Sequence, residues 1–394
     1  MKVFIVGGDD GIALTVIQSL GRAGASIVIG SKARKPISTF SKYSKRHIQY
    51  PDPEKFPEKF LDVILTEVKK EHFDVVLPLG DEGMMIISEH RDCFLPYSNI
   101  ALPEHSSLLK ARNKAETLKF AIEHGIPCPK TYFVNDIDDV RKIQGELTFP
   151  VIIKPTESSG SKGLEYVIKK ENLIDTFYKT SRNFGTVIIQ ELIPPGGDAL
   201  GFEGLFNKKS EPKAIFVHKR LREYPITGGP STLRVGVINE EIVELGTRLL
   251  KEMGWCGIAM VEFKVDPRDN IPKLMEINPR FWGSLSLPVA SGVDFPYLLC
   301  KMTMDGDIDV VPGYRTDVQS RWLFYGDFKY LIAILKGYST PWGYKSPSRI
   351  KTLFEFMDFF RKNTTYDYLS WDDPLPGIIK ILSPVLNIIF KFDH

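Results

Sequence analysis

Apolar and polar positions alternate along residues 260–265 and again along residues 273–278. A period of two predicts two half-buried strands. The residues between them, which are rich in Asp, Asn and Pro, have the chemistry of a turn, so we predict a β-hairpin. If the turn centres on Asp269, Glu262 on the first strand lies directly opposite Glu276 on the second.

The predicted hairpin carries a candidate metal site. Glu276 and Asn278 share one face of their strand, and Met275 and Ile277 are expected on the other. Like charges directly across a ladder destabilise a sheet, so the Glu262–Glu276 pair needs a compensating cation. Two carboxylates and an amide oxygen suit Mg²⁺, which takes few protein ligands plus substrate phosphates. From the hairpin alone, a solvated strand face is an equal alternative.

The apolar pattern near the N-terminus predicts an α/β unit. Residues 2–6 form a buried-type strand, a helical pattern continues through Leu20, and residues 26–29 form a second strand, which is a βαβ opening. The glycines of residues 7–11 do not match the dinucleotide fingerprint, and no acidic residue ends the second strand. Dinucleotide binding is therefore disfavoured.

A further buried strand, residues 74–77, leads into Asp81 and Glu82. Acidic residues beyond the carboxyl end of such a strand lie where α/β sheets bind ligands. A cap and first turn of the next helix is an equal alternative.

The rest of the chain predicts two more units and an extension. A strand, a loop, a second strand and one helix between residues 151 and 191 indicate a small α+β unit, and alternating segments from Glu203 onward indicate a larger antiparallel sheet. Residues after about 310 are rich in aromatic side chains. We expect domains at residues 1–110 and 111–310, with a lid at about 125–190 in the second, and a helical and aromatic extension at 311–394.

Composition narrows the class of protein. A chain of 394 residues suggests two or three domains, and a net charge of +2 argues against a nucleic-acid binder held by phosphate contacts. The four cysteines are scattered and include no C-x-x-C pair, so we expect neither disulfides nor a zinc site. The first strand leaves no room for a signal peptide, and no apolar run reaches the ~18 residues needed to span a bilayer. We expect a cytoplasmic enzyme.

A small polar loop, residues 155–163, follows the strand that ends at Lys154. Gly160 and Gly163 allow the backbone to approach a ligand closely, and successive N–H groups can hold phosphate oxygens. Lys154 supplies a compact positive charge for a phosphate. The spacing does not match a Walker P-loop, and a flexible hairpin is the alternative reading.

A second candidate ligand site lies where residues 187–191 run into a Pro- and Gly-rich connection. A strand end of this kind offers an apolar slot with backbone donors and acceptors, which suits an adenine. Asp198 or Glu191 could accept hydrogen bonds from a ribose or from the adenine amino group. The alternative is a strand followed by a crossing loop.

In order and approximate spacing, these features resemble the ATP-grasp superfamily over about residues 1–300, most specifically at residues 275–280. The resemblance implies a mixed α/β and α+β fold: a Rossmann-like N-terminal domain, a mobile lid and a C-terminal antiparallel-sheet domain, with ATP held between the last two. It also implies that a carboxylate attacks the γ-phosphate of ATP to form an acylphosphate, which a nucleophile, usually an amine, then opens.

The resemblance carries roles to particular positions, although it assigns no general base. The phosphates of ATP would contact Lys114, Lys154 and the loop residues Ser159, Gly160, Ser161 and Gly163. Adenine would lie at Glu191 and Ile193, and ribose at Asp198. Mg²⁺ (or Mn²⁺), with two ions expected, would be held by Glu262, Glu276 and Asn278. The acylphosphate or the transferring phosphoryl group would contact Arg280.

Residues 218–234 add several arginines around a Gly-Gly bend. Guanidinium groups bind carboxylates through two hydrogen bonds, so Arg220 and Arg234 are candidates for contacting a substrate carboxylate or phosphate. The alternative is an exposed basic loop. This segment resembles uncharacterised ATP-grasp carboligases and, more distantly, D-aspartate ligases and L-amino-acid ligases.

The leading hypothesis is an ATP- and Mg²⁺-dependent carboxylate–amine ligase that releases ADP and phosphate. A bicarbonate-using carboxylase is an alternative, against which stand the lack of an evident biotin-carrier domain and of a duplicated half. A nucleotide-binding regulatory protein without turnover is another, although binding alone needs fewer charges on one strand face. We expect small-molecule carboxylate and amine substrates and no nucleic-acid partner.

The tail, residues 375–394, is markedly apolar but short and interrupted by Pro384. We favour docking on the protein or on a dimer partner over peripheral membrane contact, because few Lys or Arg flank the tail. Many relatives pair through their N-terminal domains, so a homodimer is left open.

Overall fold

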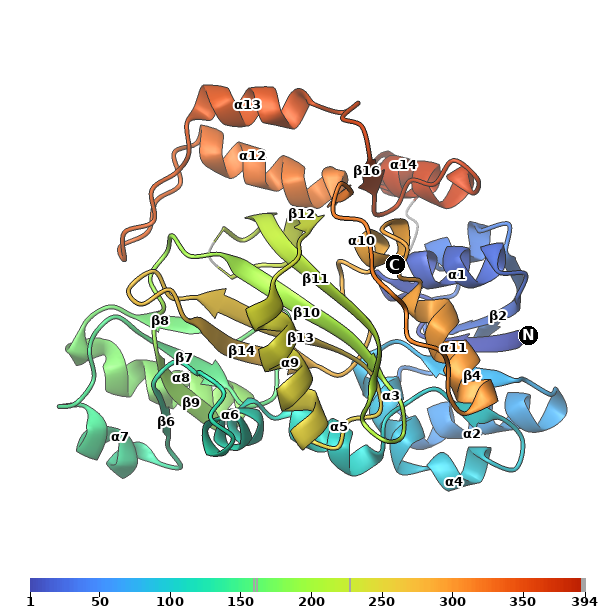
Figure 1. Cartoon of the computed structure of the whole chain (residues 1–394), viewed down its shortest axis with the longest axis horizontal. Coiled ribbons are helices and arrows are strands. Elements are labelled where there is room, and N and C mark those ends of the chain that lie inside the picture. The colour runs from blue at the N-terminus through green and yellow to red at the C-terminus, as the bar shows by residue number, and fades with distance from the viewer. Residues whose placement is uncertain (159, 161, 227, 391–394) are drawn as a thin grey trace.

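The computed structural model describes residues 1–158, 160, 162–226 and 228–390. Three sheets with helices packed against them make up these residues (Figure 1). One sheet is parallel, the second is small and antiparallel, and the third is larger and mixed. This arrangement confirms the predicted fold class.

The parallel N-terminal sheet has the strand order β3-β2-β1-β4-β5. The order reverses between β1 and β4. In open α/β sheets, the carboxyl ends of the strands at such a reversal are where ligands usually bind. The buried strand residues explain why the predicted βαβ pattern folds this way. The elements are β1 (Lys2–Val6), α1 (Ala13–Arg22), β2 (Ser26–Ser31), η1 (Ile37–Phe40), β3 (Ser44–Gln49), α2 (Pro57–Lys70), β4 (Val75–Pro78), α3 (Asp81–Glu89), α4 (Arg91–Phe94) and β5 (Asn99–Ile100).

The small antiparallel sheet has the order β6-β9-β7-β8, and its strands lie between residues 131 and 191. Its core is formed by residues such as Val140, Ile153, Phe177 and Ile189, which come from two strands and two helices. The elements are α5 (His105–Arg112), α6 (Lys114–Glu123), β6 (Thr131–Phe133), α7 (Ile137–Ile143), β7 (Val151–Pro155), β8 (Glu165–Val167), η2 (Lys170–Asn172), α8 (Leu173–Phe184) and β9 (Val187–Glu191).

The large sheet has the order β14-β13-β10-β11-β12-β15-β16. It was expected to be antiparallel, but β15 and β16 run parallel. The helices between them return the chain so that it re-enters the sheet in the same direction, as parallel pairing requires. The elements are β10 (Ala199–Phe206), β11 (Pro212–Glu223), β12 (Ser231–Gly236), α9 (Glu240–Glu252), β13 (Gly257–Val265), β14 (Pro272–Asn278), α10 (Ser286–Ala290), α11 (Phe295–Asp305), β15 (Gln319–Arg321) and β16 (Thr364–Tyr366).

The C-terminal extension is joined to the large sheet by buried ion pairs. Asp327, which is fully buried, lies 3.0 Å from Arg222 of β11 and 2.6 Å from Arg321 of β15. Arg222 also pairs with Glu355 at 2.9 Å. The two pairs made by Arg222 connect residues more than 100 positions apart. The remaining elements are a π-helical turn (Leu323–Asp327), α12 (Phe328–Leu335), α13 (Arg349–Met357) and α14 (Pro374–Phe390).

We expect Asp327→Ala to lower the free energy of unfolding by about 3–5 kcal/mol, because it leaves two buried arginines without their shared partner. Urea unfolding followed by circular dichroism measures this change. The matched control is Glu355→Ala, which removes a half-exposed partner of the same Arg222 and should cost less than about 1 kcal/mol. Equal losses in the two variants would contradict a special role for the buried pair.

Candidate functional site

A cavity of about 480 Å³ lies between the small sheet and the large sheet. Its walls come from β7, β8, β11, β13 and β14, and from the loops that join them. The structure therefore brings together candidate residues that are up to 166 positions apart in the sequence, from Lys114 to Arg280. The predicted site residues on its walls are Lys114, Lys154, Gly160, Ile193, Asp198, Arg220, Glu262, Glu276, Asn278 and Arg280.

The hairpin β13–β14 forms the acidic wall of the cavity. Glu262 pairs directly with Glu276, which confirms the predicted register. The expected position of Met275 was wrong: this residue lines the cavity instead of sharing the face of Ile277. The register shifts by one residue after Glu262, so Met275 is the extra residue of a β-bulge, and a bulge re-aims the side chains beside it.

Cationic groups surround the two carboxylates. Arg220 lies 2.6 Å from Glu262, and Lys114 lies 3.5 Å from Glu276. Burial raises the pKa of the Glu262 carboxyl, the guanidinium of Arg220 lowers it, and the neighbouring Glu276 raises it again. The repulsion expected across the ladder is therefore present, and Arg220 offsets part of it.

The donor set on this wall fits Mg²⁺. The amide nitrogen of Asn278 lies 3.4 Å from an oxygen of Glu262 and 3.4 Å from an oxygen of Glu276, so the three side chains converge. A half-turn of the amide presents its oxygen at the same place. Within the described part of the chain, no group of three or more His, Cys, Asp or Glu side chains gathers as a metal site. Two carboxylates and one amide suit a cation whose other ligands are phosphate and water oxygens.

Two lysines that were predicted to contact phosphates line the cavity next to the acidic wall. Lys154 on β7 is buried and donates a hydrogen bond to the side-chain oxygen of Gln190 at 2.7 Å. Lys114, the first residue of α6, donates to the carbonyl of Ser158 at 2.6 Å, which ties the helix to the Gly/Ser loop. Burial lowers the pKa of Lys154 to about 8, because a charged ammonium loses solvation there.

The glycines of the Gly/Ser loop have the backbone conformation that the loop requires. Gly160 and Gly163 adopt φ values of +61° and +73°, where other residues are strained. A Cβ on Gly163 would come within 2.7 Å of Pro155 and 2.9 Å of Phe184, so this position also needs the missing side chain. Unlike Gly160, Gly163 lies outside the cavity wall. Ser159 and Ser161, which were predicted to contact phosphates, lie outside the described residues.

We expect Lys154→Met to weaken ATP binding by about 10- to 100-fold. The substitution removes a buried ammonium group that can donate hydrogen bonds to the phosphates. In the wild type, the lowered pKa means that Lys154 loses its proton as the pH rises past about 8. Binding an anion must then restore that proton, so ATP affinity should fall by up to about tenfold per pH unit above this value.

Titration calorimetry across this pH range tests both effects. In Lys154→Met the fall above pH ~8 should be smaller than in the wild type. Lys162→Met removes an exposed lysine of the same loop that also lines the cavity. It is the matched comparison for charge, and its ATP affinity should keep the wild-type dependence on pH. An unchanged affinity in Lys154→Met would show that the loop is only a hairpin.

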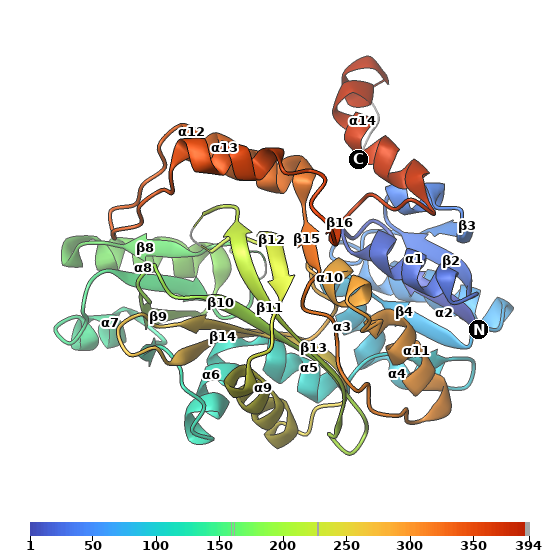
Figure 2. The same cartoon turned by 45° about the horizontal axis from the view of Figure 1, so that its top comes forward.

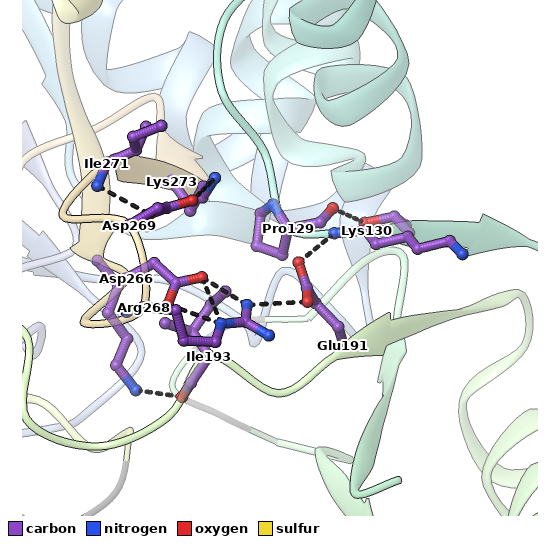
Figure 3. Close-up of polar contacts among 11 residues, drawn as sticks. Pro129, Lys130, Glu191, Ile193, Asp266, Arg268, Asp269, Ile271 and Lys273 are labelled. Atoms are coloured by element: carbon purple, nitrogen blue, oxygen red, sulfur yellow. Dashed lines mark hydrogen bonds and ion pairs between the residues drawn. The ribbon is translucent and has the colours of Figure 1, made fainter. Parts of the chain in front are cut away.

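Ile193 and Asp198, which were predicted to lie at the adenine and the ribose, both line the cavity. The carbonyl of Ile193 accepts a hydrogen bond from the ammonium of Lys264 at 3.0 Å, and Asp198 pairs with Lys219 at 2.7 Å. Figure 3 shows the contact at Ile193. Both contacts hold the connection that follows β9 against the large sheet.

Glu191, which was expected at the adenine, is absent from the cavity wall. Its carboxylate accepts a hydrogen bond from the backbone N–H of Lys130 at 2.8 Å and pairs with Arg268 at 2.9 Å (Figure 3). Arg268 belongs to the β13–β14 turn and also pairs with Asp266. The turn thus fixes the end of β9. The contacts with Lys130 and Arg268 explain why the Glu191 side chain lies outside the cavity wall.

The three candidate arginines have different surroundings. Arg220 and Arg280 line the cavity, and Arg280 pairs through its Nε with Asp81 of α3 at 2.8 Å. A helix that packs with the N-terminal sheet therefore contributes the residue that orients Arg280. Arg234 is 1% exposed and lies outside the cavity wall, contrary to the expected substrate contact. Its guanidinium instead bonds Ser286 and pairs with Asp367, which fastens the extension to β12.

Sequence reasoning missed the aromatic wall of the cavity. Tyr330 of α12 and the loop residues Trp342 and Tyr344 line it from the extension. Trp342 stacks on Tyr166 of β8, with ring centroids 4.1 Å apart and an angle of 16° between the planes. The many aromatic residues beyond position 310 were the available signal, but no spacing connects them with the small sheet.

Two family descriptions match the segments that build this cavity. "Carbamoyl-phosphate synthase L chain, ATP binding domain" matches residues 110–192, and "ATP-grasp in the biosynthetic pathway with Ter operon" matches residues 213–324. The chain belongs to the ATP-grasp superfamily. The second matched segment includes residues 275–280, on which the predicted resemblance depended most specifically.

Among curated relatives of this ATP-grasp protein, formate-dependent phosphoribosylglycinamide formyltransferase of Sulfurisphaera tokodaii is 27% identical over 232 residues, which are 56% of this chain and 54% of the relative. D-aspartate ligase of Enterococcus faecium is 26% identical over 246 residues, covering 56% and 58%. The chain thus spans only a little more than half the length of these relatives.

Solved structures share the fold. Biotin carboxylase from Campylobacter jejuni has a TM-score of 0.68 at 13% identity, over 80% of this chain and 74% of its own. L-amino acid ligase from Bacillus licheniformis has a TM-score of 0.64 at 15% identity, over 81% and 78%. At these identities the likeness shows the ATP-grasp fold alone.

Proposed function

We propose that this ATP-grasp enzyme is an ATP- and Mg²⁺-dependent carboxylate–amine ligase that releases ADP and phosphate. The observation that carries the proposal is a single cavity whose acidic wall, Glu262, Glu276 and Asn278, lies beside Lys114, Arg220 and Arg280. Phosphoryl transfer requires charge neutralisation and positioning, which such groups supply. D-aspartate ligase and D-alanine–D-alanine ligase among the relatives support the ligase reading.

Each wall of the cavity has a distinct task in this mechanism. Lys114 and Lys154 neutralise phosphate charge, and Arg220 or Arg280 receives the substrate carboxylate. Bound Mg²⁺, held by Glu262, Glu276 and Asn278, would neutralise charge on the β- and γ-phosphate oxygens. Asp81 fixes the orientation of the Arg280 guanidinium through Nε, so the reacting oxygens meet a preorganised donor.

The reaction proceeds in two transfers. A carboxylate oxygen attacks the γ-phosphorus, the bond from that phosphorus to the bridging oxygen breaks, and ADP leaves with the electron pair. The amine then attacks the carbonyl carbon of the acylphosphate. Phosphate leaves and the amine nitrogen releases a proton to solvent, which completes the amide bond.

Trapping with hydroxylamine tests this proposal. With ATP and Mg²⁺, a carboxylic acid that is a substrate should yield a hydroxamate and ADP in equal amounts. Candidate acids are found by measuring ADP release in a pool of amino acids, with each carboxylate added or withheld.

Three results would contradict a ligase. ADP release stimulated by bicarbonate, without an amine, would favour the carboxylase alternative, whose fold the chain shares with biotin carboxylases. ATP binding without ADP release under any of these conditions would favour a regulatory protein. If hydroxamate forms but no amine yields an amide, the enzyme would activate the carboxylate as an acylphosphate. The second transfer, to an amine, would then be excluded.

A further inference from the structure

The extension helix α13 turns an apolar stripe away from the protein. Ile350, Leu353, Phe354 and Met357 occupy positions i, i+3, i+4 and i+7 and are 70%, 43%, 73% and 57% exposed. This spacing places them on one helix face. In a globular protein such a stripe normally packs on the core, but here the buried positions of the helix are Thr352 and Phe356, on the other side.

The neighbouring helix α12 shows the same arrangement. Phe328, Ile332 and Leu335, at i, i+4 and i+7, are exposed, while Tyr330 and Ile334 on the other side are buried. The two helices pack against each other along the upper edge of the molecule in both views (Figures 1 and 2). We name these seven outward side chains of α12 and α13 the α12–α13 face. Phe360, which is 98% exposed, lies three residues after the end of α13.

The segment that carries the α12–α13 face has a positive net charge. Residues 328–362 contain seven Lys or Arg and two acids, which gives +5 in a chain whose total is +2. One acid, Glu355, already pairs with Arg222, so it offsets this charge only in part. The basic residues are Lys329, Lys336, Lys345, Arg349, Lys351, Arg361 and Lys362.

A third apolar helix lies on the same side of the molecule. In α14, Leu375, Ile378 and Leu382 are exposed. Figure 2 shows this helix leading away from the N-terminal sheet, on the same upper side as α12 and α13. Its beginning is docked, because Asp373 accepts hydrogen bonds from Gln18 and Ser41. Among the described residues, no helix is long and apolar enough to cross a membrane.

We propose that the α12–α13 face binds the surface of an anionic membrane. Helices with large apolar side chains on one face and Lys or Arg beside them insert into the lipid interface, and each basic residue is attracted to anionic headgroups. Long basic side chains can keep their charge at the headgroups while their stems cover the apolar face.

Charge argues against a second copy of the chain as the occupant. A two-fold symmetric dimer through this face would bring two segments of +5 together, and like charges at close range repel. A folded partner would also need a matched pocket for side chains as exposed as Phe354 and Phe360, whereas a lipid interface needs none.

Vesicle flotation of the full-length protein tests the proposal. We expect binding to phosphatidylcholine vesicles that contain phosphatidylglycerol, little binding to phosphatidylcholine alone, and release by high salt. The double variant Ile350→Glu/Phe354→Glu should bind anionic vesicles about tenfold or more weakly. The matched control is Ile238→Glu/Tyr178→Glu, which changes residues of similar exposure, 68% and 60%, outside the extension and should bind like the wild type.

Two further measurements make each outcome decisive. ATP turnover by the double variant should equal that of the wild type, which shows that the fold is intact and keeps this test separate from the ligase proposal. Light scattering without vesicles reports the oligomeric state. The proposal is overturned if the wild type does not float with anionic vesicles, or if the double variant floats equally well. A dimer that the double variant dissociates, without vesicle binding, would assign the face to a second copy.

Discussion

Glu276→Ala is expected to reduce ATP turnover by ~10³-fold or more while leaving the protein folded. Glu276 lies opposite Glu262 across the ladder, 3.4 Å from the Asn278 amide and 3.5 Å from Lys114. Its removal takes one of the two carboxylates from the predicted metal wall. Asn278→Ala should have a similar effect. Steady-state ADP release at saturating ATP and Mg²⁺ measures the loss.

Stability separates this effect from misfolding. Without Mg²⁺, Glu276→Ala should unfold at the wild-type temperature or higher, because the variant relieves repulsion between paired carboxylates. Asp269→Ala is the matched control on the same hairpin: its carboxylate pairs with Lys273 away from the cavity, so turnover should be retained. Full ADP release by Glu276→Ala or Asn278→Ala would refute the metal assignment.

The sequence was sufficient for the register of this hairpin because two local signals agree. The alternation of residues 260–265 and 273–278 sets the faces, and the turn chemistry sets the pairing. The bulge at Met275 could not be read in the same way. One extra residue interrupts the alternation of apolar and polar positions at only one point of β14. Met275 is apolar, so its type does not show which face of the strand it occupies.

Ion pairs with residues far apart in the sequence explain the other differences between the predicted and the observed site. The sequence around Arg234 contains no sign that its partner is Asp367. In the same way, the sequence around Glu191 does not indicate that it pairs with Arg268 of a distant turn. A basic or acidic side chain at a strand end suits a ligand or an ion pair equally well. The parallel N-terminal sheet was predictable, since βαβ connectivity fixes it. The domain boundaries and the roles assigned to individual site residues stay predictions.

Arg280→Lys is expected to retain ATP binding and lose most catalysis. Arg280 lines the cavity, and Asp81 holds its Nε at 2.8 Å, which orients the guanidinium plane. Lysine keeps the charge but has no planar fork to hold two oxygens and no Nε for Asp81. A contact made mainly in the transition state lowers kcat more than ground-state binding, and the loss could reach ~10³-fold.

The measurement pairs calorimetric ATP affinity with turnover under saturating substrate. Asp81→Asn is the graded comparison, because its amide oxygen can still accept from Nε while the charge is lost. This variant should lower kcat less than Arg280→Lys does, and its ATP affinity should be unchanged. If Arg280→Lys retains near-normal turnover, Arg280 is structural. The reacting oxygens would then be held by Arg220, the other candidate arginine on the cavity wall, which lies 2.6 Å from Glu262.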